Sequence, residues 1–487
     1  MASVQEVELK LEITPEGAEA LVASGLLPGD PSIAPLRSVY FDTPGQNLSA
    51  AGFSLRVRET PHGRIQTVKA AGTAAAGLFA RPEWERGVDG DMPVLDDTTP
   101  IRALLGRKVH DIGAVFAVEV ERRVWVVPWE EATIEIALDR GEVVAGERRA
   151  PVCEIELELK GGSPSALFSF ARRIDAVTPA RLGVLNKAER GFRLLGPAMR
   201  AVKAEPMALA ADMSAAEAFR RIADVCLRQF RLNEPLIDRG NVEALHQARV
   251  ALRRLRSAFS IFRPMLEDDT FERLREELRW LAGSMADARD IDVLTARADA
   301  GTLRAKLEEA RRRAYDEAEA ALASERARAV MLDLSEWLAL GSWLTLPSGE
   351  EARGQPAGDF AAAALDRFRK KVKKGGKDLA ELEDETRHEV RKDAKKMRYA
   401  AEFFAPLFQQ KRQKRRAGRF LATLEALQDR LGGLNDLATA PDLVARLGLG
   451  DDPAATALLD AGASKKMLVE AAAEAHDAFV DAKRFWR

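Results

Sequence analysis

Cysteine is scarce in this sequence, because Cys153 and Cys226 are the only two among 487 residues. Two thiols are too few for a disulfide framework, and they also exclude a zinc site built from several thiolates. So low a cysteine content fits a reducing compartment, and we therefore expect a cytoplasmic protein.

Long apolar stretches are missing as well. No run approaches about 18 uninterrupted apolar residues, and the chain does not open with a basic segment followed by an apolar one, so we expect neither a membrane span nor a secretory signal. An excess of one charge is also absent, since 74 Lys and Arg stand against 76 Asp and Glu. This balance argues against general duplex-DNA binding, and nucleic acid is not an expected partner.

The spacing of the apolar residues divides the chain into two parts. Up to about residue 195 the period is two, with turn signals such as Asp139-Arg140-Gly141, which predicts an α+β domain rich in antiparallel strands. From about residue 214 the period is 3.6, which predicts an all-α helical bundle. The predicted organisation is a first domain over 1–196, a linker over 197–213 and a helical domain over 214–487.

The second part contains an internal repeat, which predicts two related helical halves. The pattern His-x-x-Arg-x-x-x-Arg/Lys-x-x-Arg starts at His246 and again at His388, and an acidic marker follows each copy, at Asp290 and at Asp436. Offsets of 0, 3, 7 and 10 fall within about 80° on a helix, so each copy forms a basic stripe. Two facing stripes would make a channel for an elongated polyanion, although solvated amphipathic faces remain the alternative. The stripe residues are His246, Arg249, Arg253, Arg256, His388, Arg391, Lys395 and Arg398.

Acidic side chains alternate along two predicted strands of the first part. Glu6, Glu8 and Lys10 share one face of the first strand, and Glu154 and Glu156 share one face of a later strand. Either strand alone could be half-exposed, with a solvated charged face. The cations on other segments favour a second interpretation, in which they hold phosphoryl oxygens while the carboxylates hold Mg²⁺ or Mn²⁺. These cations are Arg56, Arg58, Lys69, Arg122 or Arg123, Lys187 and Arg190.

The run Glu6-x-Glu8-x-Lys10 is similar to the ExExK signature of the CYTH superfamily, the triphosphate tunnel metalloenzymes. Further family-like segments follow in order at 40–43, 52–58, 69, 81–85, 137–141, 154–158 and 187–191. The resemblance covers about residues 1–196. It implies an eight-stranded antiparallel β tunnel with flanking helices that binds a triphosphate.

The same resemblance implies roles for single residues. The expected metal ligands are Glu6, Glu8, Glu154 and Glu156, and the expected substrate-binding residues are Arg56, Arg58, Arg122, Lys187 and Arg190. Lys10, Lys69 and Asp139 complete the expected catalytic set. The choice between Arg122 and Arg123 stays open, because strict alternation places Arg122 on the face of Val118 and Val120, and a β-bulge would be needed to reconcile the two.

The stretches from His246 to Arg256 and from His388 to Tyr399, with the two acidic markers, resemble the CHAD domain, an α-helical fold named for its conserved histidines. The resemblance spans about 214–487 and implies polyphosphate binding on the basic stripes. It also adds polyphosphate granules to the expected location.

Three hypotheses for function result. The first is a Mg²⁺- or Mn²⁺-dependent triphosphatase that hydrolyses inorganic triphosphate or a related triphosphate, with a helical domain that binds polyphosphate. The second is a non-catalytic protein that binds polyphosphate and localises it. The third is an adenylate cyclase of the same superfamily, which would need a base-reading pocket that the sequence does not indicate.

Overall fold

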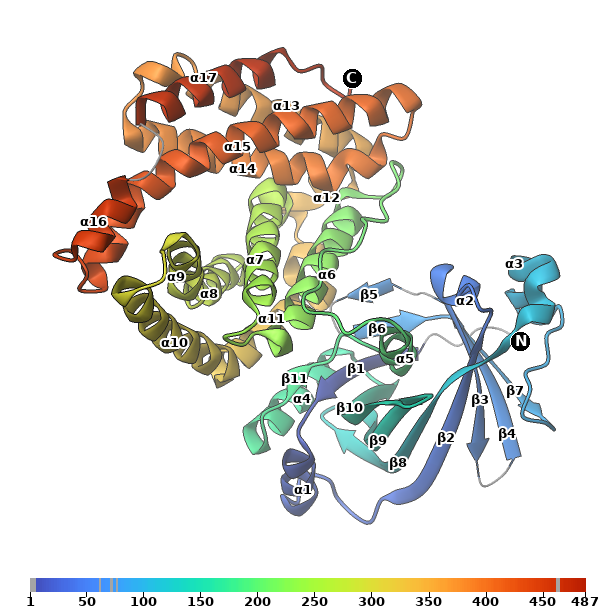
Figure 1. Ribbon diagram of the computed structural model, residues 1–487. Coiled ribbons are helices and arrows are strands. Elements are labelled where there is room, and N and C mark those ends of the chain that lie inside the picture. The colour runs from blue at the N-terminus through green and yellow to red at the C-terminus, as the bar shows by residue number, and fades with distance from the viewer. Residues whose placement is uncertain (1–5, 61–62, 71–72, 76–77, 461–464) are drawn as a thin grey trace. The chain divides into compact units, whose positions relative to one another are not determined.

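The computed structural model describes residues 6–60, 63–70, 73–75, 78–460 and 465–487 (Figure 1). The chain forms two compact units: the first contains 1–200 and 323–341, and the second contains 201–322 and 342–487. The first unit is an antiparallel sheet with helices, and the second is helical, so the predicted fold class is confirmed. The predicted domain boundaries remain a prediction; by its contacts, segment 323–341 belongs with the sheet.

The sheet of the first unit closes on itself. β5 pairs with β6 and β4 pairs with β7, so β4–β5 and β6–β7 are the two arms of one hairpin, and β6 also pairs with β1. Around the ring the order is β1, β10, β9, β8, β2, β3, the β4–β5 arm and the β6–β7 arm, which returns to β1. The strands are β1 (Glu6–Glu12), β2 (Ser32–Asp42), β3 (Phe53–Thr60), β4 (Gly63–Ala70), β5 (Thr73–Ala75), β6 (Leu78–Arg81), β7 (Glu83–Val88), β8 (Gly113–Trp129), β9 (Ala132–Ala145), β10 (Arg148–Gly161) and β11 (Arg181–Leu182). Two interrupted arms and the short β11 beside β1 thus account for eleven described strands in an eight-stranded tunnel.

One turn signal was wrong, because Asp139-Arg140-Gly141 lies inside β9. A Cβ at Gly141 would lie 2.0 Å from the carbonyl oxygen of Glu119 on β8. Glycine is therefore needed there for the close approach of two strand backbones, and it does not mark a turn.

The α-helices described in the first unit are α1 (Pro15–Ala23), α2 (Asn47–Ala50), α3 (Ile101–Leu105), α4 (Ser165–Val177), α5 (Lys187–Leu195) and α11 (Glu325–Leu340). α4 contacts β1, where Leu9 and Leu11 are fully buried, so the apolar face of β1 points out of the tunnel. Helix α5 contacts β8, β9 and β10 and closes one end of the interior with an apolar cluster. Its packing is tight, because a Cβ at Gly191 would lie 2.1 Å from the ring of Phe116.

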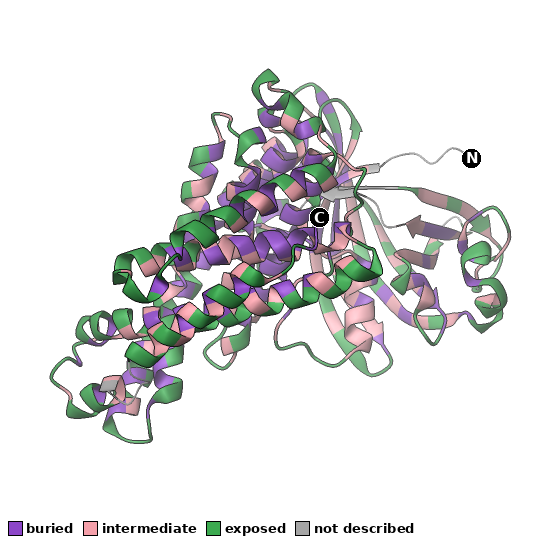
Figure 2. Cartoon of the chain, turned by 90° about the horizontal axis from the view of Figure 1, so that it is seen from above, coloured by how far each residue is buried: buried purple, intermediate pink, exposed green. Residues whose placement is uncertain are grey.

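The second unit consists of helices with short 3₁₀ turns. The helices are α6 (Ala215–Asn233), α7 (Val242–Phe262), α8 (Phe271–Gly283), α9 (Ala286–Arg297), α10 (Thr302–Ala323), α12 (Glu350–Gly354), α13 (Ala357–Gly375), α14 (Asp384–Phe404), α15 (Lys411–Arg446), α16 (Pro453–Asp460) and α17 (Lys465–Asp481). Buried and exposed stretches alternate along them, as expected for amphipathic helices (Figure 2). None of the helices in the described ranges has the length and apolar character that a membrane crossing requires. The predicted internal repeat remains a prediction.

Candidate functional site

The tunnel encloses a cavity of about 260 Å³ with an almost wholly polar lining. Side chains from eight of the described strands and from α5 reach it, because alternate residues of each strand point inward. The lining residues are Glu8, Lys10, Tyr40, Ser54, Arg56, Arg58, Thr67, Lys69, Glu83, Glu85, Arg122, Glu135, Glu156, Glu158, Lys160, Asn186, Lys187 and Ala188.

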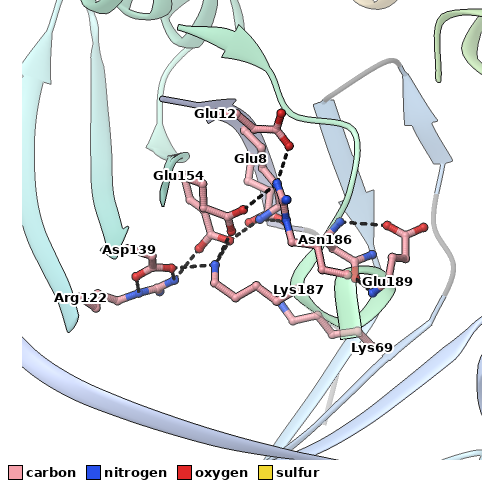
Figure 3. Close-up of polar contacts among 12 residues, drawn as sticks. Glu8, Glu12, Lys69, Arg122, Asp139, Glu154, Asn186, Lys187 and Glu189 are labelled. Atoms are coloured by element: carbon pink, nitrogen blue, oxygen red, sulfur yellow. Dashed lines mark hydrogen bonds and ion pairs between the residues drawn. The ribbon is translucent and has the colours of Figure 1, made fainter. Parts of the chain in front are cut away.

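Three carboxylates converge on the ammonium of Lys187 (Figure 3). Its Nζ lies 2.6 Å from Asp139 Oδ2 and 2.9 Å from Glu156 Oε1, and it also donates to Glu154. Asp139 and Glu154 are buried. One ligand oxygen from each of the three carboxylates lies within 4.8 Å of the others, so Asp139, Glu154 and Glu156 form a compact oxygen donor set.

Arg122 enters the same cluster from β8. It donates to both oxygens of Asp139, at 2.7 and 2.6 Å, and to Glu156 at 2.6 Å. Arg123 instead pairs with Glu121, at 2.8 Å, so Arg122 is the arginine that faces the tunnel.

Strict alternation along β8 holds at Arg122, and the pairing with β9 continues through it in register. Val118 and Val120 therefore also point into the interior. There they belong to the apolar cluster that packs against α5. The inner face is therefore apolar near α5 and charged further along, and the bulge considered from the sequence is not required.

Glu156 is the acidic hub of the site. It accepts from Lys10 as well as from Lys187 and Arg122, and Lys10 Nζ also lies 3.5 Å from Glu8 Oε1. Burial would raise the pKa of Glu156, but the charges of Lys10, Lys187 and Arg122 outweigh it and hold the pKa well below its ordinary value. Burial alone would lower the pKa of Lys10, but the charges of Glu156 and Glu8 outweigh burial and hold the pKa above its ordinary value. The ammonium therefore stays charged.

Arg56 and Arg58 behave differently from the other cations of the cavity. They are adjacent inward residues of β3, and neither makes an ion pair with a carboxylate in the described part of the chain. Arg56 interacts with the hydroxyl of Tyr40, Arg58 donates to Ser38 at 3.3 Å, and the Nε of Arg56 is buried with no hydrogen-bond partner. Repulsion from Arg56, followed by burial, lowers the pKa of Arg58 to about 10. This part of the cavity therefore carries two positive charges that no described carboxylate contacts directly, although Glu83 attracts Arg56 and Glu156 attracts Arg58 from further away.

The remaining predicted residues have other surroundings. Lys69 pairs with Glu83 at 2.8 Å, and Arg190 pairs with Glu12 and, at 3.4 Å, with Glu154. The side chain of Glu6 lies outside the described part of the structure.

Several lining residues were missed from the sequence. Glu83 and Glu85 lie on β7, whose run was not recognised as a strand, although its glutamates alternate with Trp84 and Arg86. Glu135 lies opposite Glu158 in the register of β9 and β10, and alternation along β9 could have revealed it, because it shares a face with Asp139. Tyr40 lies opposite Arg56 in the register of β2 and β3, so the pairing of these strands reveals its place beside the arginine.

In the second unit, the two basic stripes lie on α7 and α14, which contact each other. Arg254 of α7 donates to Glu402 of α14 at 2.8 Å, and Arg398 binds the same carboxylate at 3.1 Å. His388 shares a hydrogen bond of 2.9 Å with Asn435, next to the second acidic marker.

The middle of the two stripes, which we call the α7–α14 seam, contains Arg253, Arg391 and Lys395. None of these three makes an ion pair with a carboxylate of the described residues, and the Nε of Arg391 is buried without a hydrogen-bond partner. Burial, then the charges of Arg391 and Arg253, lowers the pKa of Lys395 to about 7. The seam is therefore a concentrated, partly buried positive surface.

The flanking stripe residues line the same two helices. Burial and the charge of Arg289 lower the pKa of His246. Arg249 donates to the carbonyl of Ala282 at 3.1 Å, and burial followed by neighbouring arginines lowers the pKa of Arg256.

Comparison with known proteins gives matches for both units. Residues 4–192 match the family model of the CYTH domain, and residues 221–445 match that of the CHAD domain. The inorganic triphosphatase of Haemophilus influenzae is 30% identical over 202 residues, which cover 39% of this chain and 55% of that protein. The chain thus spans little more than half the length of this curated relative.

Solved structures give similar matches. The CHAD domain from the plant Ricinus communis is 30% identical, with a TM-score of 0.49, over 59% of this chain and 98% of that one. A putative adenylyl cyclase from Hippeastrum, described as having a dominant triphosphatase activity, is 17% identical with a TM-score of 0.29, over 38% of this chain and 93% of that one. By the two family models, the chain contains a CYTH domain in residues 4–192 and a CHAD domain in residues 221–445.

Proposed function

We propose that the tunnel hydrolyses inorganic triphosphate or a related triphosphate with the help of Mg²⁺ or Mn²⁺, and that the helical half binds polyphosphate. The observation that carries the enzymatic part is the division of charge across one cavity. Arg56 and Arg58 line the cavity without an ion pair to any described carboxylate, and Glu156 lines another part of it and forms one oxygen donor set with the buried Asp139 and Glu154. A linear polyanion with a bound divalent cation matches both sides.

The arginine pair supplies the anion-binding side. Two adjacent buried guanidiniums repel each other, and a phosphoryl group between them would remove that repulsion while accepting charge-assisted hydrogen bonds. Arg56 is held by Tyr40, whose ring stacks on Phe116 with the ring centroids 4.7 Å apart. The free guanidinium edges can therefore bind phosphoryl oxygens without first breaking an ion pair.

The three carboxylates fit a divalent cation by the chemistry and closeness of their oxygens. Asp139, Glu154 and Glu156 would hold Mg²⁺ or Mn²⁺, with Glu8 as a further proposed ligand and Glu6 proposed from the resemblance alone. Such an ion neutralises charge that develops on phosphoryl oxygens during phosphoryl transfer.

The chain's own cations at the acidic cluster have a second proposed task. Lys187, Arg122 and Lys10 now neutralise the carboxylates. Each can reach a phosphoryl oxygen only by giving up part of its carboxylate contacts, whereas Arg56 and Arg58 are available at once. We expect the first three to orient a triphosphate already held by the arginine pair, with Asp139 also able to position the attacking water and Lys69 and Arg190 supporting the ends of the site.

Polyphosphate binding is proposed for the α7–α14 seam and the stripe residues that flank it. Arg253, Arg391 and Lys395 form a positive surface and make no ion pair with a carboxylate of the described residues, and such a surface attracts an extended polyanion in a salt-dependent manner. An enzyme held on polyphosphate would gather where that polymer gathers, so the proposal includes a cytoplasmic location at polyphosphate granules.

A substrate panel tests the enzymatic proposal. Purified full-length protein is incubated with tripolyphosphate, ATP and long-chain polyphosphate, with and without Mg²⁺ or Mn²⁺, and released phosphate and cyclic AMP are measured. Wild type is compared with Arg56→Gln, Glu8→Ala and the exposed control Arg37→Gln. We expect phosphate release from a triphosphate that requires metal and is lost in the first two variants only.

The outcomes of the panel separate the hypotheses. If no substrate releases phosphate while a separate titration shows that polyphosphate binds, the chain is a non-catalytic binding protein. Formation of cyclic AMP from ATP would instead favour a cyclase.

A further inference from the structure

Helix α11 belongs to the tunnel unit although the chain on both sides of it belongs to the helical unit. Residues 201–322 precede it and residues 342–487 follow it in the second unit. It also lies inside the stretch that matches the CHAD domain model. The helical half therefore contributes one helix to the neighbouring domain.

A buried ion pair fixes the start of α11 on α4. Arg328 donates from Nε to Asp175 Oδ1 at 2.5 Å, and the side chains are only 9% and 8% exposed. Because an ion pair so shielded from water requires both partners, removal of either one leaves an uncompensated charge. Arg328 also donates to the carbonyl of Ala323, just before the helix begins.

A second ion-pair group holds α11 one to two turns further along. Arg172 of α4 donates to Asp333 at 2.7 Å and to Glu336 at 2.5 Å. Asp333 and Glu336 are three residues apart and so lie on one face of α11. The helix is therefore attached to α4 at two separate points along its length.

The carboxylate that receives Arg328 also holds the chain that leads into the tunnel site. Asp175 Oδ1 accepts the backbone N–H of Ala180 at 2.8 Å, directly before β11. Helix α11 contacts β11, and β11 pairs with Leu11 and Glu12 of β1. The backbone N–H of Gly183 then donates to the carbonyl of Lys10 at 2.8 Å. Four residues later the chain reaches Lys187, whose ammonium lies at the centre of the three carboxylates.

We propose that α11 is a docking helix through which the helical half fixes residues 180–186 against β1 and thereby positions Lys187 in the tunnel. Arg328, near the start of α11, is the positioning residue, because it shares the Asp175 oxygen that anchors this segment. The link to substrate binding rests on the proposed function, whereas the anchoring of 180–186 does not.

Hydrogen exchange in the full-length protein tests the anchoring. Arg328→Ala should speed amide exchange in 180–186 by at least roughly tenfold while exchange in β8 and β9 stays as in wild type, because only the local support is lost. Arg326→Ala, an exposed arginine of the same helix, is the matched control and should leave exchange unchanged. Wild-type exchange of 180–186 in Arg328→Ala would overturn the proposal.

A double-mutant cycle tests the link to Lys187. Tripolyphosphate affinity is measured by calorimetry at saturating Mg²⁺ for wild type, Arg328→Ala, Lys187→Ala and the double variant. Arg328→Ala should weaken binding roughly fivefold when Lys187 is present and have no effect when it is absent. Equal losses in both backgrounds would show that α11 does not act through Lys187.

The two measurements distinguish a failure of the proposed function from a failure of the proposed anchoring. If the wild-type protein binds no tripolyphosphate, the proposed function is wrong, but the exchange experiment still decides whether α11 anchors 180–186.

Discussion

Arg122 grips Asp139 with two hydrogen bonds, from Nε at 2.7 Å and from Nη2 at 2.6 Å. Asp139 is completely buried, and Arg122 also reaches Glu156, so the guanidinium joins two neighbouring carboxylates. Burial lowers the pKa of Arg122, but Glu156 and Asp139 outweigh it and raise the value well above the ordinary one. This bidentate contact requires the planar guanidinium group of an arginine, which presents two N–H donors side by side.

A lysine at position 122, as in Arg122→Lys, should therefore not replace the function of the arginine. Lysine keeps the charge but presents a single ammonium, so one of the two bonds to Asp139 is lost. The loss of a charged hydrogen bond is worth about 2 kcal/mol, and we expect triphosphate hydrolysis to fall roughly 30-fold. Steady-state phosphate release measures the effect. Arg123→Lys, which alters only the pair with Glu121, is the control, and an equal loss in both variants would contradict the prediction.

Arg58→Met should separate stability from binding. Arg56 is the main cause of the lowered pKa of Arg58, followed by burial, so the two guanidiniums destabilise each other in the unliganded protein. Removing one charge should raise the free energy of unfolding by roughly 0.5–1 kcal/mol and weaken tripolyphosphate binding about tenfold. Urea denaturation and calorimetry measure the two effects. A variant that is less stable and binds as tightly as wild type would show that the pair is structural.

Lys187→Ala should increase the affinity for a divalent cation while it lowers hydrolysis. The ammonium contacts Asp139, Glu154 and Glu156, so it competes with a cation for the same oxygens. We expect Mn²⁺ to bind about tenfold more tightly, as followed by the paramagnetic signal of the free ion. Lys160→Ala, which removes the pairs with Glu135 and Glu158, is the control. Chelation of the metal should abolish hydrolysis in wild type, and unchanged Mn²⁺ affinity in Lys187→Ala would place the ion elsewhere.

Polyphosphate binding should weaken as pH rises through neutrality. Lys395 has a pKa of about 7 in the folded protein, so it loses its charge between about pH 6 and 8 in the unbound seam. Binding titrations across this range should show a falling affinity that Lys395→Arg flattens, because arginine stays charged. An identical pH dependence in the variant would exclude Lys395 as the cause.

The same group has the opposite effect on stability. Because its folded pKa lies below the ordinary lysine value of 10.5, the native state releases the proton first. Its contribution to the free energy of unfolding therefore increases as pH rises from about 7 towards 10.5.

The sequence predicted the faces of the tunnel strands better than their surroundings. Alternation correctly grouped Glu8 with Lys10 and Glu154 with Glu156, because each strand points alternate residues inward. It also placed Arg122 with the valines of β8, but a single strand gives no sign that these valines lie inside the tunnel. That fact depends on α5, which packs against them from residues far along the chain.

The site also contains relationships that only the folded chain creates. Lys187 was expected to bind phosphate, but its central place among the carboxylates comes from the capping of α5 by Asn186 and its packing against β10. The pattern of α11 predicts an amphipathic helix, yet nothing in it tells which unit its apolar face will join. Pairing partners of this kind are decided by tertiary packing and not by local periodicity.

The closed ring of strands affects the order in which the protein can fold during synthesis. β1 is synthesised before β10, and Lys10 pairs with Glu156, which follows 146 residues later. At about 5–20 residues per second the first strand waits on the order of ten seconds for β10, and longer for α11, which belongs to the same unit. Pairings of such high sequence separation also slow folding itself. Until β10 has been synthesised, a translating ribosome therefore carries an open, incomplete sheet to which chaperones can bind.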